Sequence, residues 1–133
     1  MPRMGFLIDL AVVALGGAFG AVVRHGLTAA LPALPGSKAM IGTIVANLLG
    51  CMAIGALGQW VELDASNWSQ RQLLLVRVGM LGSLTTFSTF TSEAWSLGND
   101  GRLGMLLFHL AAHLIMGFTA FWLGSTLVRE LAT

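Results

Sequence analysis

Four long apolar stretches constrain the fold of this chain more than any other feature of its sequence. A helix that crosses a bilayer needs about 20 consecutive, mostly apolar residues, and such stretches lie at about 6–31, 39–61, 72–97 and 103–128. The composition agrees, because 56% of the 133 residues are hydrophobic and only 10% are charged, against roughly a quarter in an ordinary soluble domain. We therefore predict an all-α integral membrane protein, in which residues 1–133 form a single four-helix transmembrane domain.

The remaining composition excludes several classes of protein. A net charge of +1 gives no basic surface for nucleic acid, and no motif pairs a nucleophile with a base, so an enzyme is not expected. The chain passes from Met1-Pro2-Arg3 into the first apolar stretch without a clear small-residue cleavage site, so we expect a retained helix rather than a signal peptide. The single cysteine, Cys51, has no partner for an intrachain disulfide and is interpreted as a packing residue.

The third stretch has a polar centre that a helix in lipid does not need. From Gly82 to Glu93 it contains seven hydroxyl residues and one carboxylate. Serine and threonine compete for backbone carbonyls and glycine adds backbone freedom, so we interpret this stretch as a transmembrane helix that is broken at its centre. Broken backbone at membrane depth is tolerated where it is buried in protein or lines a wet cavity, and it is common at ion sites. An ion site is therefore the favoured interpretation, with hydroxyl hydrogen bonds between packed helices as the alternative.

Two further polar residues lie inside the first two stretches. Arg24 is about one turn from the end of the first stretch, so it either reaches the membrane interface or draws anions to a pore mouth. Asn47 lies near the middle of the second stretch, where it either hydrogen-bonds to another helix or offers an amide N–H to an anion. Small residues at intervals of four indicate close helix packing, and they stand at Gly16, Gly20, Gly42, Ala46 and Gly50.

The positive charges give almost no bias for one orientation in the membrane. With four spans, one side would hold Arg3, Arg71 and Arg129, and the other side Lys38 and Arg102, with Arg24 near that end. Positive-inside bias normally sets topology, so this chain could insert both ways, and two opposite copies would form an inverted pair. Because no internal repeat is visible in the sequence, the pairing would be between chains.

Three motifs carry a family resemblance. They are Gly16-Gly17-Ala18-Phe19-Gly20-Ala21-Val22-Val23-Arg24, then Gly42-Thr43 with Asn47-Leu48-Leu49-Gly50, and then Gly82 with Thr85-Thr86-Phe87-Ser88-Thr89-Phe90 and Glu93. With these motifs the chain resembles, over essentially its whole length, the CrcB/Fluc family of fluoride channels. The resemblance implies a fluoride-selective channel that exports fluoride passively and lowers its cytoplasmic concentration. It also implies an antiparallel, dual-topology homodimer in the plasma membrane, which is the inner membrane in bacteria, with a structural sodium ion at the dimer centre.

The resemblance further implies a role for particular residues. The backbone carbonyls of Gly82 and Thr85 would hold the sodium ion. The pore would include Phe87, Phe90, Asn47 and Thr119, with Arg24 at its entrance and Glu93 as the carboxylate of the third helix.

The chemistry of these residues suits a small anion. Removing water from such an ion is very unfavourable unless the site replaces its hydrogen bonds, and the possible donors are Asn47 with the hydroxyls of Ser88, Thr89 and Thr119. Phe87 and Phe90 are three residues apart and share a helix face. The positive edge of an aromatic ring attracts an anion weakly, as conduction requires; ordinary lipid or core packing is the alternative for both rings.

The sequence departs from the family at His109 and His113, which replace a tyrosine and a serine if the fourth helix is aligned on Gly117 and Gly124. A neutral imidazole donates from one nitrogen, so we expect each histidine to replace a hydroxyl donor. An imidazole also gains a proton near pH ~6.5 when unperturbed, which predicts a pH dependence of flux between about 5 and 7. The alternative is that both histidines only pack within the helix bundle.

Two other functions stay open at the level of sequence. A small dual-topology, proton-coupled exporter needs a carboxylate inside the membrane, and Asp9 or Glu93 would have to supply it. A haem or metal anchor would use His109 and His113, but only Cys51 and Glu93 are available as further ligands.

Overall fold

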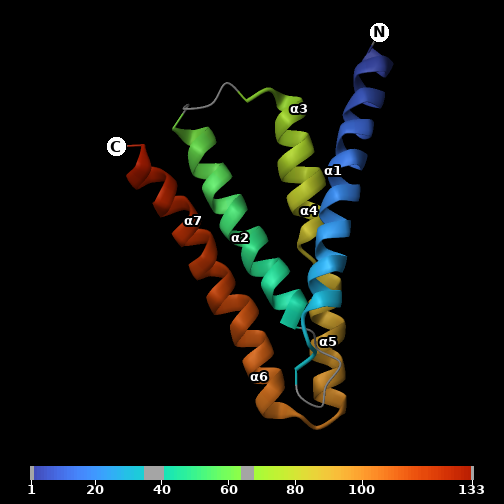
Figure 1. The fold of residues 1–133 in the computed structure, drawn as a ribbon, viewed down its shortest axis with the longest axis vertical. Helices are drawn as coiled ribbons and strands as arrows, with labels where there is room; N and C mark the ends of the chain where they lie inside the picture. Colours follow the sequence, from blue (N-terminus) through green and yellow to red (C-terminus); the bar gives the residue numbers. More distant parts are fainter. Residues whose placement is uncertain (1, 35–40, 64–67, 133) are drawn as a thin grey trace.

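The computed structural model describes residues 2–34, 41–63 and 68–132. All long elements within these ranges are helices (Figure 1). Four helical segments are long and apolar enough to cross a membrane: Met4–Ala30, Ile41–Glu62, Gln70–Asn99 and Leu103–Leu131. This confirms the prediction of an all-α architecture with four apolar spans, and the chain is a multi-pass membrane protein. The ends of α1 and α7 that carry the two termini lie at the same end of the bundle (Figure 1).

The first two spans are single helices. Helix α1 runs from Pro2–Ala30, so it begins four residues before the predicted 6–31, because proline is tolerated in the first turn of a helix. Helix α2 runs from Ile41–Glu62. It ends one residue beyond the predicted 39–61, and the predicted start at 39 and 40 lies outside the described residues.

The third span consists of four consecutive elements: α3 (Gln70–Leu73), the π-helical η1 (Leu74–Leu81), α4 (Gly82–Leu84) and α5 (Phe87–Asn99). It starts two residues before the predicted 72–97 because Ser69 and Gln72 form a capping box, in which Ser69 N donates to Gln72 Oε1 at 2.7 Å. It ends two residues later than predicted, since the left-handed residue that turns the chain is Gly101, with φ 68°.

Two residues separate α4 from α5. Thr85 has φ −84° and ψ 150°, and Thr86 has φ −148° and ψ 114°, so both are extended rather than helical. The first half of the third span and α5 therefore meet at these two threonines, near the middle of the molecule.

The fourth span contains α6 (Leu103–Ala111), the π-helical η2 (Ala112–Met116) and α7 (Gly117–Leu131). It starts where 103–128 was predicted and continues three residues further, because no glycine or proline follows Gly124 to end the helix.

Glycines bring the spans into backbone contact. Helix α1 lies along η1 and α4, while α2 lies along α7 (Figure 1). A Cβ atom added to Gly20 would stand 2.1 Å from Met80 O, and one added to Gly124 would stand 2.1 Å from Met52 O. Backbones that approach this closely are typical of membrane helices packed through small residues.

Few apolar side chains are buried inside the protomer. The described core is the cluster of Ala46, Leu57, Leu81 and Leu84, whereas many large apolar side chains, such as Leu15 and Phe118, point outward. An apolar exterior of this extent suits contact with lipid or with another membrane helix.

Candidate functional site

Asn47 holds the extended segment of the third span in place. Thr86 N donates to Asn47 Oδ1 at 2.8 Å, and Asn47 Nδ2 donates to Thr86 O at 3.3 Å. This two-point pairing replaces hydrogen bonds that the backbone of Thr86 would make in a helix. One N–H of the Asn47 amide is left over after these contacts.

Thr86 also starts α5. Its Oγ1 accepts from Thr89 N at 3.2 Å, which makes it the N-cap, and donates to Thr89 Oγ1 at 3.0 Å. Ser88 Oγ lies 3.3 Å from the same Oγ1 atom. The structure thus gathers Ser88 and Thr89, both predicted donors, at the N-terminus of α5, where the helix dipole favours negative charge.

The same contacts alter the surroundings of the Gly82 and Thr85 carbonyls. In a continuous helix, Thr86 N would donate to Gly82 O and Thr89 N would donate to Thr85 O. Here Thr86 N donates to Asn47 and Thr89 N to the Thr86 hydroxyl. Both carbonyls therefore lose the donors that a helix would give them, which makes their lone pairs more accessible to a cation.

Arg24 lies beside this segment rather than at the end of its helix. Its Nε donates to Ser83 O at 2.9 Å, at the C-terminal end of α4, where a helix favours a positive charge. Arg24 is therefore joined to the third span, and both sequence interpretations of its role stay predictions.

A cavity of about 250 Å³ opens next to Thr85 and Thr86. Its lining residues come from α2, from the third span and from the fourth span, and they are Asn47, Cys51, Thr85, Thr86, Phe87, Phe90, His113 and Leu114. The cavity brings together four predicted pore residues that are far apart in the sequence.

An aromatic cluster forms one wall of this cavity. The rings of Phe87 and Phe90 have centroids 5.6 Å apart and are tilted by 45°. Phe90 also stacks on His109, with centroids at 5.4 Å and an angle of 18°, and lies 4.6 Å from the centroid of His113. The orientation of Phe90 is thus set by two imidazoles of the fourth span.

A buried polar cluster lies behind Phe90. Thr43 Oγ1 donates to Glu93 Oε1 at 2.8 Å, and His109 Nε2 stands 3.5 Å from Glu93 Oε2. Thr43 and His109 are 0% exposed and Glu93 is 7% exposed. Ionisable groups so deep in a membrane protein commonly mark an ion pathway. The sequence reasoning assigned no role to Thr43, although Thr43 stands four residues before Asn47 on the same helix face.

His113 uses its proton within its own helix. Its Nδ1 lies 3.0 Å from His109 O, and a carbonyl oxygen only accepts, so Nδ1 carries the proton. A neutral imidazole has one N–H. A neutral His113 therefore has no N–H left for an anion, in contrast to the role expected from the sequence.

Comparison with known proteins decides the family. The family described as "CrcB-like protein, Camphor Resistance (CrcB)" matches residues 11–125. The chain belongs to the CrcB family. It is 39% identical to "Fluoride-specific ion channel FluC" of Rhodopirellula baltica, over 96% of this chain and 98% of that protein. A protein of the same name in Agrobacterium fabrum is 36% identical, over 94% of this chain and 99% of that protein. Another, in Hahella chejuensis, is 38% identical, over 90% of this chain and 94% of that protein.

These relatives confirm the family predicted from the motifs, and they do not favour the two alternative functions. The names of these relatives describe an ion channel and not a proton-coupled exporter. In the described part of this CrcB chain, no group of three or more His, Cys, Asp or Glu residues is placed to hold a metal ion.

Two residues of interest lie apart from the cavity. Thr119 Oγ1 donates to Ile115 O at 2.9 Å on the exposed side of α7, so its place in the pore stays a prediction. Arg77, to which the sequence reasoning assigned no role, is an exposed cation in η1, and no hydrogen bond or ion pair joins its side chain to the described residues. The sequence does show it, as a charge at the sixth residue of the predicted apolar span 72–97.

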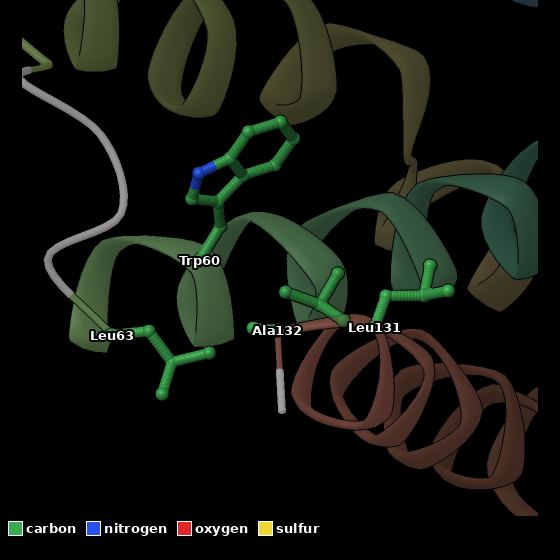
Figure 2. Close-up of a pocket in the computed structure, with 5 residues that line it drawn as sticks. Trp60, Leu63, Leu131 and Ala132 are labelled. Atoms are coloured by element: carbon green, nitrogen blue, oxygen red, sulfur yellow. The ribbon is translucent and has the colours of Figure 1, made fainter.

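A second cavity, of about 260 Å³, is apolar and lies at the end of α2 and α7. Figure 2 shows Trp60 of α2 and Leu131 of α7, together with Leu63 and Ala132, which directly follow these two helices. No carboxylate, amide or hydroxyl side chain lines this cavity, so the cavity beside Asn47 is the more polar of the two.

Proposed function

We propose that this chain is a fluoride-selective channel that exports fluoride passively across the plasma membrane, the inner membrane of a bacterium, and so lowers the cytoplasmic concentration of fluoride. The observation that carries the proposal is the cavity beside Thr85 and Thr86, which combines an amide, hydroxyls and two phenylalanines in a chain whose full-length relatives are named fluoride-specific ion channels.

The polar groups of this cavity replace part of the hydration shell of the anion. A buried anion is strongly unfavourable unless hydrogen-bond donors surround it. Asn47 supplies the N–H that its pairing with Thr86 leaves over. Beyond the residues that line the cavity, the hydroxyls of Ser88 and Thr89, held around Thr86 Oγ1, supply further donors at the positive end of α5.

The phenylalanines supply weaker contacts along the path. Ring edges are positive and attract an anion, and weak contacts at several sites allow an ion to leave as well as to enter. Phe90 is held in a fixed orientation by His109 and His113. Phe87 is 78% exposed in the protomer, so its ring is available to a second copy of the chain.

The functional unit in this proposal is an antiparallel, dual-topology homodimer centred on the break in the third span. With Arg77 included, one side of the membrane would have four positive charges, at Arg3, Arg71, Arg77 and Arg129. The other side would have three, at Arg24, Lys38 and Arg102. Four against three is still a weak positive-inside bias, so the revised count supports insertion in both orientations.

Tags on the C-terminus should therefore be found on both sides of the membrane in comparable amounts, because the loop charges do not select one orientation. Protease accessibility of the tag in sealed membrane vesicles measures this. Two or three lysines added beside the C-terminus should skew the ratio and lower fluoride flux. Tags that are found on one side only would contradict dual topology.

A structural sodium ion at the dimer centre fits the donors that this chain offers. Gly82 O and Thr85 O of two opposed chains would provide four oxygens, a ligand set suited to a hard cation and poor for zinc or copper. The ion would supply positive charge that holds the two broken helices together. A crystal structure of the dimer should show one ion on the two-fold axis with oxygen neighbours only, and nitrogen or sulfur ligands would contradict the assignment.

Electrical recording of the reconstituted protein tests the proposed function against the proton-coupled alternative. A passive fluoride channel should give a current whose reversal potential follows the fluoride gradient and does not move when a proton gradient alone is imposed. A reversal potential that moves with the proton gradient would support the exporter instead.

A further inference from the structure

His113, one of the residues that line the cavity, has one imidazole nitrogen without a hydrogen bond to the described residues. Nδ1 donates to His109 O at 3.0 Å. Nε2 is buried and has no hydrogen-bond partner in the part of the chain that the structure describes. When His113 is neutral, Nε2 therefore carries only a lone pair, which can accept a hydrogen bond but cannot donate one.

This ring borders the space assigned to the anion. His113 lines the same cavity as Asn47, Phe87 and Phe90, and its centroid lies 4.6 Å from that of Phe90 and 4.5 Å from that of His109. These ring contacts, together with the hydrogen bond to His109 O, fix the orientation of the imidazole, in which Nδ1 bonds to the backbone and Nε2 does not.

Protonation reverses the interaction of Nε2 with an anion. The lone pair of the neutral ring repels a negative ion. A proton on Nε2 converts the same atom into a donor that carries a positive charge, and charge-assisted hydrogen bonds are roughly twice as strong as neutral ones. The Nδ1 bond to His109 O is kept in both states, because both nitrogens of an imidazolium donate.

We propose that His113 is a proton-dependent donor to the anion, so that fluoride binding in this cavity is coupled to the uptake of one proton by Nε2. The proposal rests on the proposed function, since it requires that fluoride occupies the cavity. The proton comes from water and stays on His113 while the anion moves on, so the flux remains passive. Binding linkage is reciprocal, so acid should tighten fluoride binding and fluoride should favour the charged form of His113 by the same factor.

Three titratable groups face His113 from the elements packed around it. Glu93 on α5 carries a negative charge when it is ionised, and its Oε2 lies 3.5 Å from His109 Nε2. His109 on α6 carries a positive charge when it is protonated, and its ring centroid lies 4.5 Å from that of His113. Cys51 on α2 shares the cavity. Because His109 Nε2 stands 3.5 Å from Glu93 Oε2, a proton on His109 would be compensated by that carboxylate, which leaves His113 as the group that responds to the anion.

Nitrogen NMR of the dimer labelled with ¹⁵N-histidine, in lipid nanodiscs, tests the coupling directly. The neutral form of His113 should show a protonated Nδ1 and an unprotonated Nε2. Replacing sodium chloride with sodium fluoride should move its titration midpoint to higher pH, with a coupling factor within the usual range of about 5–150. His113→Gln identifies the signal, and the signal of the exposed His25 serves as an internal control that should not move. A midpoint for His113 that is the same in both salts overturns the proposal.

Fluoride efflux at several pH values provides the second measurement. Between about pH 7.5 and pH 5, the apparent half-saturating fluoride concentration should fall about tenfold, after subtraction of the leak through protein-free liposomes at each pH. His113→Ser keeps a hydroxyl donor that does not titrate, so it should conduct without this pH dependence, whereas His25→Gln should keep it. Flux that is present at neutral pH but insensitive to acid overturns this inference alone. Absence of flux at every pH overturns the proposed function.

Discussion

Phe90→Ile should reduce fluoride flux by about tenfold or more. The substitution removes a ring that lines the cavity, and with it the contact partner of the His109 and His113 imidazoles. Each aromatic contact contributes about 0.5–1.5 kcal/mol, and about 1.4 kcal/mol corresponds to a factor of ten. Phe87→Ile should act in the same direction, because Phe87 lines the same cavity. Fluoride efflux from liposomes with matched amounts of protein measures both effects.

Phe6→Ile is the matched control for this experiment. Phe6 is also an exposed phenylalanine, but it lies near the start of α1 and does not line the cavity. Its replacement should leave the flux close to that of the unmodified protein. Normal flux in both Phe87→Ile and Phe90→Ile would remove these rings from the pore.

Gly124→Ala should separate α2 from α7 and destabilise the folded protein. An added Cβ would stand 2.1 Å from Met52 O and 2.9 Å from Met52 C, and these backbone atoms have no freedom to move aside without moving the helix. Overpacking of this kind destabilises a fold by about 1–3 kcal/mol. Gly55→Ala should have a similar effect, because its Cβ would stand 2.2 Å from Phe121 O. Thermal unfolding in detergent, followed by size-exclusion chromatography, measures the loss.

Gly58→Ala tests whether this effect comes from the contact rather than from the residue type. Gly58 lies on the same helix as Gly55, but an added Cβ would meet nothing within 4 Å. This variant should be as stable as the unmodified protein, or slightly more so, since alanine is a better helix former than glycine. Equal stability of Gly124→Ala and Gly58→Ala would argue against backbone contact between α2 and α7.

Hydrophobic pattern was sufficient to place the four spans, because only long apolar helices satisfy their backbone groups within a bilayer. The dense hydroxyls between Gly82 and Glu93 also directed attention to the segment where Thr85 and Thr86 leave helical geometry. The helix ends were less accurate. The capping box of Ser69 and Gln72 was readable in the sequence, yet the third span was predicted to begin at 72.

The contacts that build the site could not be predicted, because they join residues far apart in the chain. Asn47 pairs with Thr86 across 39 positions, and Thr43 donates to Glu93 across 50. The sequence left two roles open for Asn47, a hydrogen bond to another helix or an N–H for an anion. The structure shows the first of these, but the sequence did not identify Thr86 as the partner. Which nitrogen of His113 carries the proton depends on the distance to His109 O, and local pattern contains no information on that distance.

Fluoride efflux from liposomes that contain only the purified protein tests the central claim most directly. Liposomes loaded with fluoride are diluted into fluoride-free buffer at neutral pH, with an ionophore that carries the counter-ion and no proton gradient. The account predicts rapid fluoride release that depends on the protein, and much slower release of chloride from liposomes loaded with chloride. Fluoride release no faster than from protein-free liposomes would contradict it.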